Sequence, residues 1–344
     1  MATFDIFNND AFSVSQLTGT IVDIPRVPTM LGDMRLFSES GITTPSFMIE
    51  RKGAALNLVP TAPRGGVGQG LESTGRKLIT LSTVHLPQRD AILADVVYGI
   101  RAFGSETEVE SLSTVVRERM VQMRQNLDLT LEYHRLGALK GLVVDADGTT
   151  PILNVYSAFG MTQVTQYWNI ATASTTIDPT ELTQNLKAAI RAKLGGRSFT
   201  RVRVVCSSSF LKKYRGHNKM KEAYARWQEG AFLRSSGTSA NGMQEDFAFD
   251  GVVFSVYEGE VGGNELIEDG YAYAYPEGVP GMFRTVYAPA DYQETVNTVG
   301  VPYYAKQERM RFDKGVELEA QSNPLCFNQL PEAVIKLSVL ATAP

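Results

Sequence analysis

Apolar residues recur every three or four positions between about Glu106 and Leu139, which is the period of one face of an α-helix. No proline or glycine interrupts this stretch before Gly137. At about 1.5 Å per residue, the pattern predicts one helix on the order of 50 Å long, far longer than the usual helix of roughly 11–12 residues. The stripe consists of Val109, Leu112, Val116, Met120, Met123, Leu127, Leu131, His134 and Ala138.

The opposite face of this predicted helix is charged. A long stripe of this kind fits either a coiled coil or a single beam against which a sheet packs. Because four of the nine stripe residues are Val or Met, only three are Leu and none is Ile, the stripe differs from a typical coiled-coil seam, and we favour the beam. We expect the stripe to pack on residues 309–320 of the same chain. The charged face carries Glu110, Arg117, Glu118, Arg124, Gln125, Asp128, Glu132 and Arg135.

Before the long helix, the pattern is mainly that of β-strands. Strand-like runs occur at residues 47–50, 56–59 and 78–84. Between them, the segment Gly65–Gly70 contains four glycines. We therefore predict a long hairpin with a glycine-rich tip, which cannot bury enough apolar surface to order itself without a neighbour.

Other local signals precede the long helix. We predict short helices at residues 10–17 and 91–100, and an extended segment at 24–28, where two prolines exclude regular helix. This extended segment fits an arm that lies on another molecule or an ordinary lead-in to the core. Ser105, with Glu108 three residues later, is the predicted N-cap of the long helix.

The clearest local signal lies in the second half of the chain. Asp178 is the predicted N-cap of a helix, Pro179 its first residue and Glu181 its capping-box partner, and Gly195 follows its last residue. Strands are predicted at 142–144, 152–156, 163–170, 201–206, 271–275 and 309–320, a hairpin at 247–257, and helices at 208–214 and 218–229. Residues 179 to about 295 thus form an α+β unit with its own turns and caps.

Composition restricts the class of protein. The chain has 344 residues, of which 43% are hydrophobic and 20% charged, so it is long enough for one large domain or two with a sizeable core. A net charge of -4 argues against a surface that binds nucleic acid everywhere. Cys206 and Cys326 are too far apart for a CxxC motif, which argues against a disulfide framework. We expect no signal peptide and no membrane span.

No catalytic constellation is apparent in the sequence. His85, His134 and His217 lack paired spacing, and His134, on the apolar stripe, is better explained as a core histidine. The glycine-rich segment lacks the ending of a phosphate-binding loop. The segment Asp145–Gly148 lacks the calcium-loop spacing and is better explained as a hairpin turn. We therefore predict no enzyme activity, no cofactor and no metal site.

One basic cluster remains as a candidate contact surface. It contains Lys212, Lys213, Arg215, Lys219 and Lys221, with His217 among them. Such a cluster fits a phosphate, an acidic neighbouring subunit or simply a solvated helix face.

Several short motifs carry a resemblance to a known family. In the first half they are Arg76-Lys77-Leu78, Leu86-Pro87, Asp95 and Arg101-Ala102-Phe103-Gly104. In the last part they are Asn297-Thr298-Val299-Gly300, Tyr303-Tyr304-Ala305-Lys306, Asp313-Lys314-Gly315 and Gln321-Ser322-Asn323-Pro324-Leu325. With the order of elements, they make residues 20–340 similar to the lambda-like major capsid protein E family of tailed phages, whose fold is shared with herpesvirus shell floors and encapsulins.

The resemblance implies an α+β major capsid fold with five segments. These would be an N-terminal arm (1–43), an extended loop (44–86), a peripheral domain with the spine helix (87–178), an axial domain (179–296) and a return to the peripheral domain (297–344). The loop, with its tip at Arg64, Gly65, Gly66, Val67, Gly68, Gln69 and Gly70, would lie over a neighbouring subunit. The charged face of the spine helix would look into the shell or across to a neighbour.

The implied function is self-assembly, through hexamers and pentamers, into an icosahedral shell that encloses double-stranded DNA without reading its sequence. The implied partners are a portal, a decoration or cement protein and a separate scaffolding protein, since only about 40 residues precede the extended loop. The protein would be assembled in the host cytoplasm and reside in the virion capsid. Two alternatives remain: an encapsulin-like compartment that holds protein cargo, and a two-domain α/β enzyme, which lacks a catalytic constellation.

Overall fold

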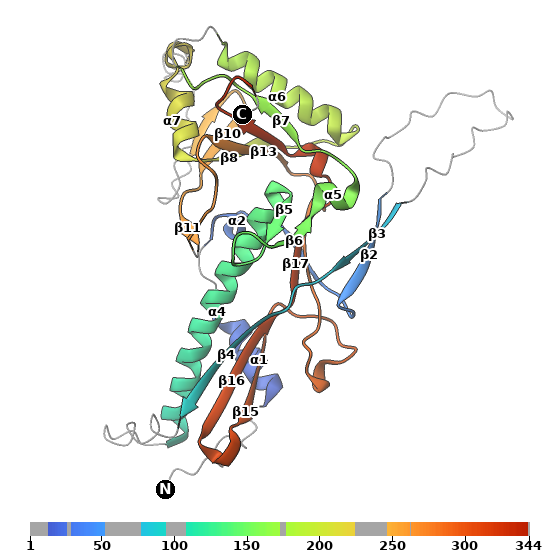
Figure 1. Ribbon diagram of the computed structural model, residues 1–344, viewed down its shortest axis with the longest axis vertical. Coiled ribbons are helices and arrows are strands. Elements are labelled where there is room, and N and C mark those ends of the chain that lie inside the picture. The colour runs from blue at the N-terminus through green and yellow to red at the C-terminus, as the bar shows by residue number, and fades with distance from the viewer. Residues whose placement is uncertain are drawn as a thin grey trace, which may run out of the picture. The chain divides into compact units, whose positions relative to one another are not determined.

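The computed structural model describes residues 13–25, 29–51, 77–93, 108–172, 177–223, 246–261 and 263–342. The chain is an α+β protein with two compact units (Figure 1). Unit 1 comprises Met1–Met48, Thr80–Arg135 and Arg284–Cys326, and unit 2 comprises Ile49–Ile79, Leu136–Phe283 and Phe327–Pro344. The chain therefore passes between the two units several times, and neither unit is one continuous segment.

Unit 1 is built on helix α4 (Glu108–Lys140), whose last turn belongs to unit 2. The predicted long helix is thus confirmed, with both ends within two residues. Beside it lies a three-stranded antiparallel sheet in the order β15 (Tyr304–Arg309), β16 (Gly315–Ser322) and β4 (Leu86–Leu93) (Figure 1).

The apolar stripe of α4 packs on this sheet, as predicted. Val116, Met120, Met123 and Leu127 are all at most 5% exposed and share one core with the inward-facing residues of the strands. Those strand residues are Ile92, Ala305, Val316, Leu318 and Ala320. Alternate residues of each strand face this core, which leaves the outer face of the sheet to polar side chains.

Two sequence predictions in this region are wrong. Residues 309–320 do not form one strand, because the short 3-10 helix η5 (Arg311–Asp313) turns the chain between β15 and β16. Residues 91–93 are not helical but end β4, where Ile92 pairs with Val316 of β16. The rest of that predicted helix, and the predicted Ser105 cap, fall outside the described residues.

The N-terminal segment leads into unit 1. Helix α1 (Val14–Asp23) begins four residues later than predicted, and the side chain of its N-cap Ser13 accepts a hydrogen bond from the Gln16 amide. Leu17 and Ile21 are buried in the core of α4 and its sheet. The described part of the expected arm therefore covers the core of its own unit. Residues 26–28, which contain one of the two prolines, lie outside the described residues.

Further short elements complete unit 1. They are α2 (Met30–Asp33), β1 (Ser38–Gly41), η4 (Gln293–Thr295) and a small sheet in the order β1, β14 (Phe283–Tyr287), β17 (Pro324–Asn328). Gly300 is required by close packing, since a Cβ there would lie 2.1 Å from the Tyr287 carbonyl oxygen. Its amide donates to the Ile42 carbonyl at 2.9 Å.

The base of the predicted hairpin is present as two paired strands, β2 (Ser46–Arg51) and β3 (Lys77–Ser82). The third predicted run, residues 56–59, and the glycine-rich tip lie outside the described residues.

Unit 2 contains a mixed six-stranded sheet in the order β7, β18, β13, β8, β10, β9. These strands are β7 (Val164–Tyr167), β18 (Ile335–Ser338), β13 (Tyr271–Glu277), β8 (Arg201–Cys206), β10 (Val252–Val256) and β9 (Asp246–Phe249). Helices α6 (Pro179–Leu194) and α7 (Ser208–Gly216) lie beside it (Figure 1). An aromatic cluster of Trp168, Phe210, Tyr214 and Phe254 fills the core under α7, with ring centroids 4.8–6.3 Å apart.

The N-cap and C-terminal glycine of the helix and the two hairpins predicted for unit 2 are confirmed. Asp178 caps α6 by accepting from the Thr180 amide at 2.9 Å, and Gly195 ends the helix in the left-handed conformation. Asp250 and Gly251 both have positive φ angles, which is the geometry of a two-residue type I′ hairpin turn. Strands β5 (Leu142–Val144) and β6 (Pro151–Asn154) form the other predicted hairpin, and helix α5 (Val155–Phe159) begins directly after it.

The C-terminal strand lies in unit 2. β18 pairs with both β13 and β7 inside the six-stranded sheet. Unit 2 thus joins Phe327–Pro344 to Leu136–Phe283, although Arg284–Cys326 between them belongs to unit 1. A central strand position, with two hydrogen-bonded neighbours, satisfies both edges of β18.

Candidate functional site

The charged face of α4 is buried in its second half, which the sequence did not indicate. Arg124, Asp128, Glu132 and Arg135 are between 2% and 6% exposed. They follow one another at intervals of four, four and three residues, so they lie on one side of the helix. The expectation that this face looks outward is wrong for these four residues, because the N-terminal segment covers them.

Arg124 and Asp128 form the first part of this buried polar face. The Arg124 Nε donates to Asp128 Oδ1 at 3.1 Å, and its Nη1 donates to the Ile21 carbonyl, near the end of α1, at 2.5 Å. The guanidinium also lies 3.7 Å from the centre of the Tyr303 ring, and the Tyr303 hydroxyl donates to Asp128. Burial, with the negative charge of Asp128, raises the pKa of Tyr303 above its usual range, so this hydroxyl keeps its proton.

Glu132 forms the second part by capping another helix. Its carboxylate accepts from the backbone amides of Leu31 at 2.6 Å and Gly32 at 3.2 Å. These amides lie at the start of α2, where N–H groups have no carbonyl acceptor within the helix. Thr29, the N-cap residue of α2, makes no side-chain cap bond. A carboxylate from a residue about 100 positions along the chain thus replaces the local cap.

Arg135 completes the buried polar face by reaching Glu39 on β1 at 2.5 Å. The four side chains of α4 therefore hold α1, α2 and β1 in turn. Within unit 1, α4 is held on one side by the core under the sheet and on the other side by charged hydrogen bonds.

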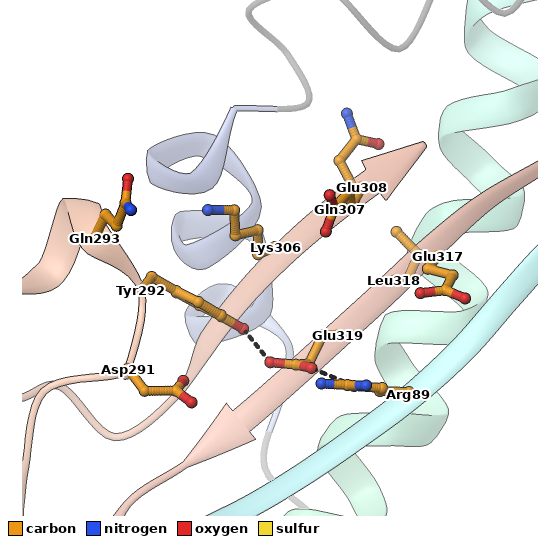
Figure 2. Close-up of a pocket in the computed structure, with 10 residues that line it drawn as sticks. All are labelled: Arg89, Asp291, Tyr292, Gln293, Lys306, Gln307, Glu308, Glu317, Leu318 and Glu319. Atoms are coloured by element: carbon orange, nitrogen blue, oxygen red, sulfur yellow. Dashed lines mark hydrogen bonds and ion pairs between the residues drawn. The ribbon is translucent and has the colours of Figure 1, made fainter. Parts of the chain in front are cut away.

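The outer face of the sheet in unit 1 carries a hollow of about 330 Å³ (Figure 2). Figure 2 shows Tyr292 on one side of it, with Arg89 from β4 and Glu319 from β16 meeting near its centre. The hollow is lined by Arg89, Asp291, Tyr292, Gln293, Lys306, Gln307, Glu308, Glu317, Leu318 and Glu319.

Charge at this hollow is balanced at one end only. Lys306, Glu319 and Arg89 lie side by side across the three strands, and the Arg89 Nε donates to Glu319 at 2.5 Å. Hydrogen bonding to Glu319 and the nearby carboxylates raises the pKa of Arg89. Two residues further along β15, on the same face of the sheet, Glu308 lies directly opposite Glu317 of β16.

The residues proposed from sequence occupy different places. The described part of the chain does not include the loop tip, from Arg64 to Gly70. Of the basic cluster on α7 and the turn after it, Lys212, Lys213, Arg215, Lys219 and Lys221 are exposed, whereas His217 is 1% exposed. The structure therefore exposes the five cations and removes the histidine from the cluster.

The remaining chemical candidates have structural roles. His134 is 1% exposed, which fits the core interpretation. Asp147 accepts from the Thr149 and Thr150 amides and closes the turn between β5 and β6, and these hydrogen bonds lower its pKa. Among the described residues, no group of three or more His, Cys, Asp or Glu is placed to hold a metal ion, and none of the helices there is long and apolar enough to span a bilayer.

The comparisons with known proteins cover nearly the whole chain. Residues 13–339 match the family described as phage major capsid protein E. The chain is 24% identical to the major capsid protein of Salmonella phage Felix O1 (isolate Felix O1-VT1), over 94% of this chain and 95% of that protein. It is 25% identical to the major capsid protein of Pseudomonas phage KPP10, over 94% and 96%.

Solved structures show the same fold at lower identity. A prophage protein of E. coli CFT073 aligns with a TM-score of 0.55 at 12% identity, covering 95% of this chain and 99% of that one. A phage-related protein of Bordetella bronchiseptica RB50 aligns with a TM-score of 0.51 at 13% identity, covering 97% and 99%. The family is a structural one. The chain belongs to the phage major capsid protein E family, and it is a structural subunit of the capsid shell.

Proposed function

We propose that copies of this chain assemble through hexamers and pentamers into a closed icosahedral shell around double-stranded DNA. The observation that carries the proposal is the way α4 is fixed on two sides within unit 1. Its apolar stripe packs on β4, β15 and β16, and its polar face binds the N-terminal segment. A subunit in a shell must transmit load between its neighbours, and a helix held on both sides resists bending.

The resemblance divides the chain into parts with separate roles in this shell. Residues 87–178 and 297–344 are the peripheral domain, and residues 179–296 are the axial domain that meets its copies around the symmetry axes. The segment 44–86, whose base is the β2–β3 pair, is the extended loop that lies over a neighbouring subunit. The resemblance extends the proposal to a separate scaffolding protein, a portal and a cement protein, and to assembly in the host cytoplasm.

Electron microscopy of the purified particles, with an assay of their contents, tests this function. We expect icosahedral particles whose capsomers have five-fold and six-fold symmetry, and which contain DNA when isolated from virions. Particles of the same fold that contain a protein cargo and no DNA would support the encapsulin-like alternative. Monomers or open tubes as the only species would contradict closed assembly.

The tip of the extended loop has its own test. Deleting Gly65–Gly70 should leave a soluble subunit with an unchanged circular dichroism spectrum, because this glycine-rich segment contains only one apolar side chain, Val67, that a core could bury. The same variant should fail to form stable shells. Shells of normal yield and normal thermal stability would refute a role for the tip between subunits.

The exposed cations of the basic cluster provide a second contact. We propose that Lys212, Lys213 and Lys219 meet phosphate or an acidic neighbouring subunit, and replacing all three by Gln separates these partners. Lower DNA content at unchanged particle yield would identify phosphate, and lower particle yield would identify the subunit. No change in either would refute the contact. Arg197→Gln, an exposed cation elsewhere in unit 2, is the matched control.

A further inference from the structure

The tip of the β15–β16 hairpin presents an unusual side chain. Phe312 is 90% exposed, the highest value among the large hydrophobic residues that the structure describes; the next is Met48 at 68%. Phe312 also has a φ angle of 63°, in the left-handed region that is costly for a bulky residue. The chain thus places an aromatic ring in water and accepts backbone strain to do so.

The residues around Phe312 are basic. Arg309, Arg311 and Lys314 lie within three positions of it, and Asp313 is the single acidic residue in the same span. Arg311 and Lys314 are exposed. The tip is therefore an aromatic knob with positive charge around it, and two such tips would repel each other. Exposed aromatic and arginine side chains of this kind are enriched at protein interfaces.

The hollow on the outer face of the same sheet has the opposite character. Four of its lining residues are acidic and two are basic, and Glu319 and Lys306 are already paired with Arg89 and Glu294. Glu308 and Glu317 lie directly opposite each other on β15 and β16, a like-charge pair that destabilises the isolated sheet. Figure 2 shows both carboxylates at the end of the hollow away from Asp291. A cation from outside would remove this repulsion.

We propose that the tip of one copy of this chain docks in the hollow of a second copy, with Phe312 entering the hollow and Arg311 and Lys314 meeting Glu308 and Glu317. The charges of the two surfaces are complementary, and both carry a local cost that the contact relieves. The proposal rests on the proposed homo-oligomeric shell and names one of its contacts.

The position of the two surfaces defines the kind of assembly. Phe312 follows Glu308 by four residues in the sequence, so the tip and the hollow are neighbouring parts of one hairpin. A contact between two different surfaces is heterologous, and it closes when the rotation between copies completes a ring. We therefore expect a head-to-tail arrangement of copies, in which each tip meets the hollow of a neighbour and not its tip.

Charge reversal with rescue tests the contact in the full-length protein. One variant carries Arg311→Glu and Lys314→Glu, a second carries Glu308→Lys and Glu317→Lys, and a third carries all four changes. The second keeps a like-charge pair across the strands, so its subunit should be about as stable as the wild type. We expect particle yield, measured by sedimentation, to fall at least about tenfold in each double variant, and to recover in the quadruple variant.

Two results would overturn the contact while leaving the shell intact. One is normal particle yield in both double variants, and the other is a quadruple variant that assembles no better than either of them while its subunit melts normally. Phe312→Ala should also lower the yield, without lowering the melting temperature of the dissociated subunit. If the wild-type protein forms no particles, it is the proposed function that fails.

Discussion

Replacing Glu132 by alanine is the most direct test of the buried polar face of α4. In the folded protein this carboxylate is 2% exposed and accepts from the amides of Leu31 and Gly32. Leu31 is fully buried and Gly32 is buried as well, so water cannot readily replace the lost acceptor. The substitution leaves two donors at the start of α2 without partners.

The expected loss of stability follows from these two bonds. A buried donor without a partner costs about 1–3 kcal/mol. Since two such donors lose their partner, we expect Glu132→Ala to lower the free energy of unfolding by about 2–6 kcal/mol. Glu132→Gln keeps the shape and one acceptor oxygen but turns an NH₂ group toward the second amide, so its loss should be about half as large.

Two measurements on dissociated subunits check this expectation. Urea denaturation gives the global change, and hydrogen exchange gives the local change at Leu31 and Gly32. In Glu132→Ala both amides should exchange faster, while the Leu17 amide, which bonds to Ser13 in α1, should change less. The comparison separates loss of the α2 cap from general unfolding.

An ordinary exposed helix cap contributes about 1 kcal/mol. The reasoning would be refuted if Glu132→Ala lowered the free energy of unfolding by less than this and left hydrogen exchange at Leu31 and Gly32 unchanged. Equal losses in the alanine and glutamine variants would also contradict it. In that case burial of the carboxylate, and not its two hydrogen bonds, would determine the energy.

Three further predictions address other parts of the fold. Met120→Ala should cost about 2–5 kcal/mol in urea denaturation because it opens a cavity in the core under the sheet. Leu129 is 43% exposed on the same helix, so Leu129→Ala should change stability by less than about 0.5 kcal/mol. Similar losses in the two variants would contradict the assigned faces of α4. Burial raises the pKa of the Cys206 thiol to about 12 and that of Cys326 to about 11. Neither thiol should therefore react with a thiol reagent until the protein unfolds, and rapid labelling of the native protein would disprove this. The free energy of unfolding should also fall as the pH rises above the thiol pKa of the unfolded chain, about 8.5. Asp178→Ala should cost about 1 kcal/mol and reduce exchange protection of the Thr180 amide, while Asp178→Asn keeps the cap and should match the wild type.

The features that the sequence predicted correctly depend on neighbouring residues. The extent of α4, the Asp178 cap and the Asp250–Gly251 turn each follow from a few consecutive positions, because helix period, cap and turn chemistry are properties of the local backbone. The same holds for the apolar stripe, whose Val and Met residues could face only an apolar partner. Even the choice of that partner, the segment near β16, was correct.

The errors arise where a distant segment determines the outcome. Residues 91–93 have a helical spacing of apolar positions, but pairing with β16 makes them a strand, since tertiary hydrogen bonds outweigh a weak local preference. The segment 309–320 has no glycine or proline before Gly315. The turn at Phe312 is therefore imposed by the pairing of β15 with β16, against the preference of the residue itself.

The candidate surfaces divide in the same way. The basic cluster was visible as a run of charges, and its exposure follows from the buried positions of Tyr214 and His217 between its members. The hollow and the Glu308–Glu317 pair were not visible, because these residues come together only through the register of two strands. No sequence signal distinguishes them from other exposed glutamates.

The sequence by itself determined that this chain has a long amphipathic beam, a compact α+β unit with its own caps, and motifs of a capsid family. Only the tertiary structure decided what the charged side of the beam does. A charged helix face is stable in water or against hydrogen-bonding partners, and periodicity cannot distinguish these cases. The partners of Arg124, Glu132 and Arg135 lie about 100 residues away, in α1, α2 and β1. Folding brings them back over α4, and a face that would otherwise be solvated becomes the attachment that makes the beam rigid.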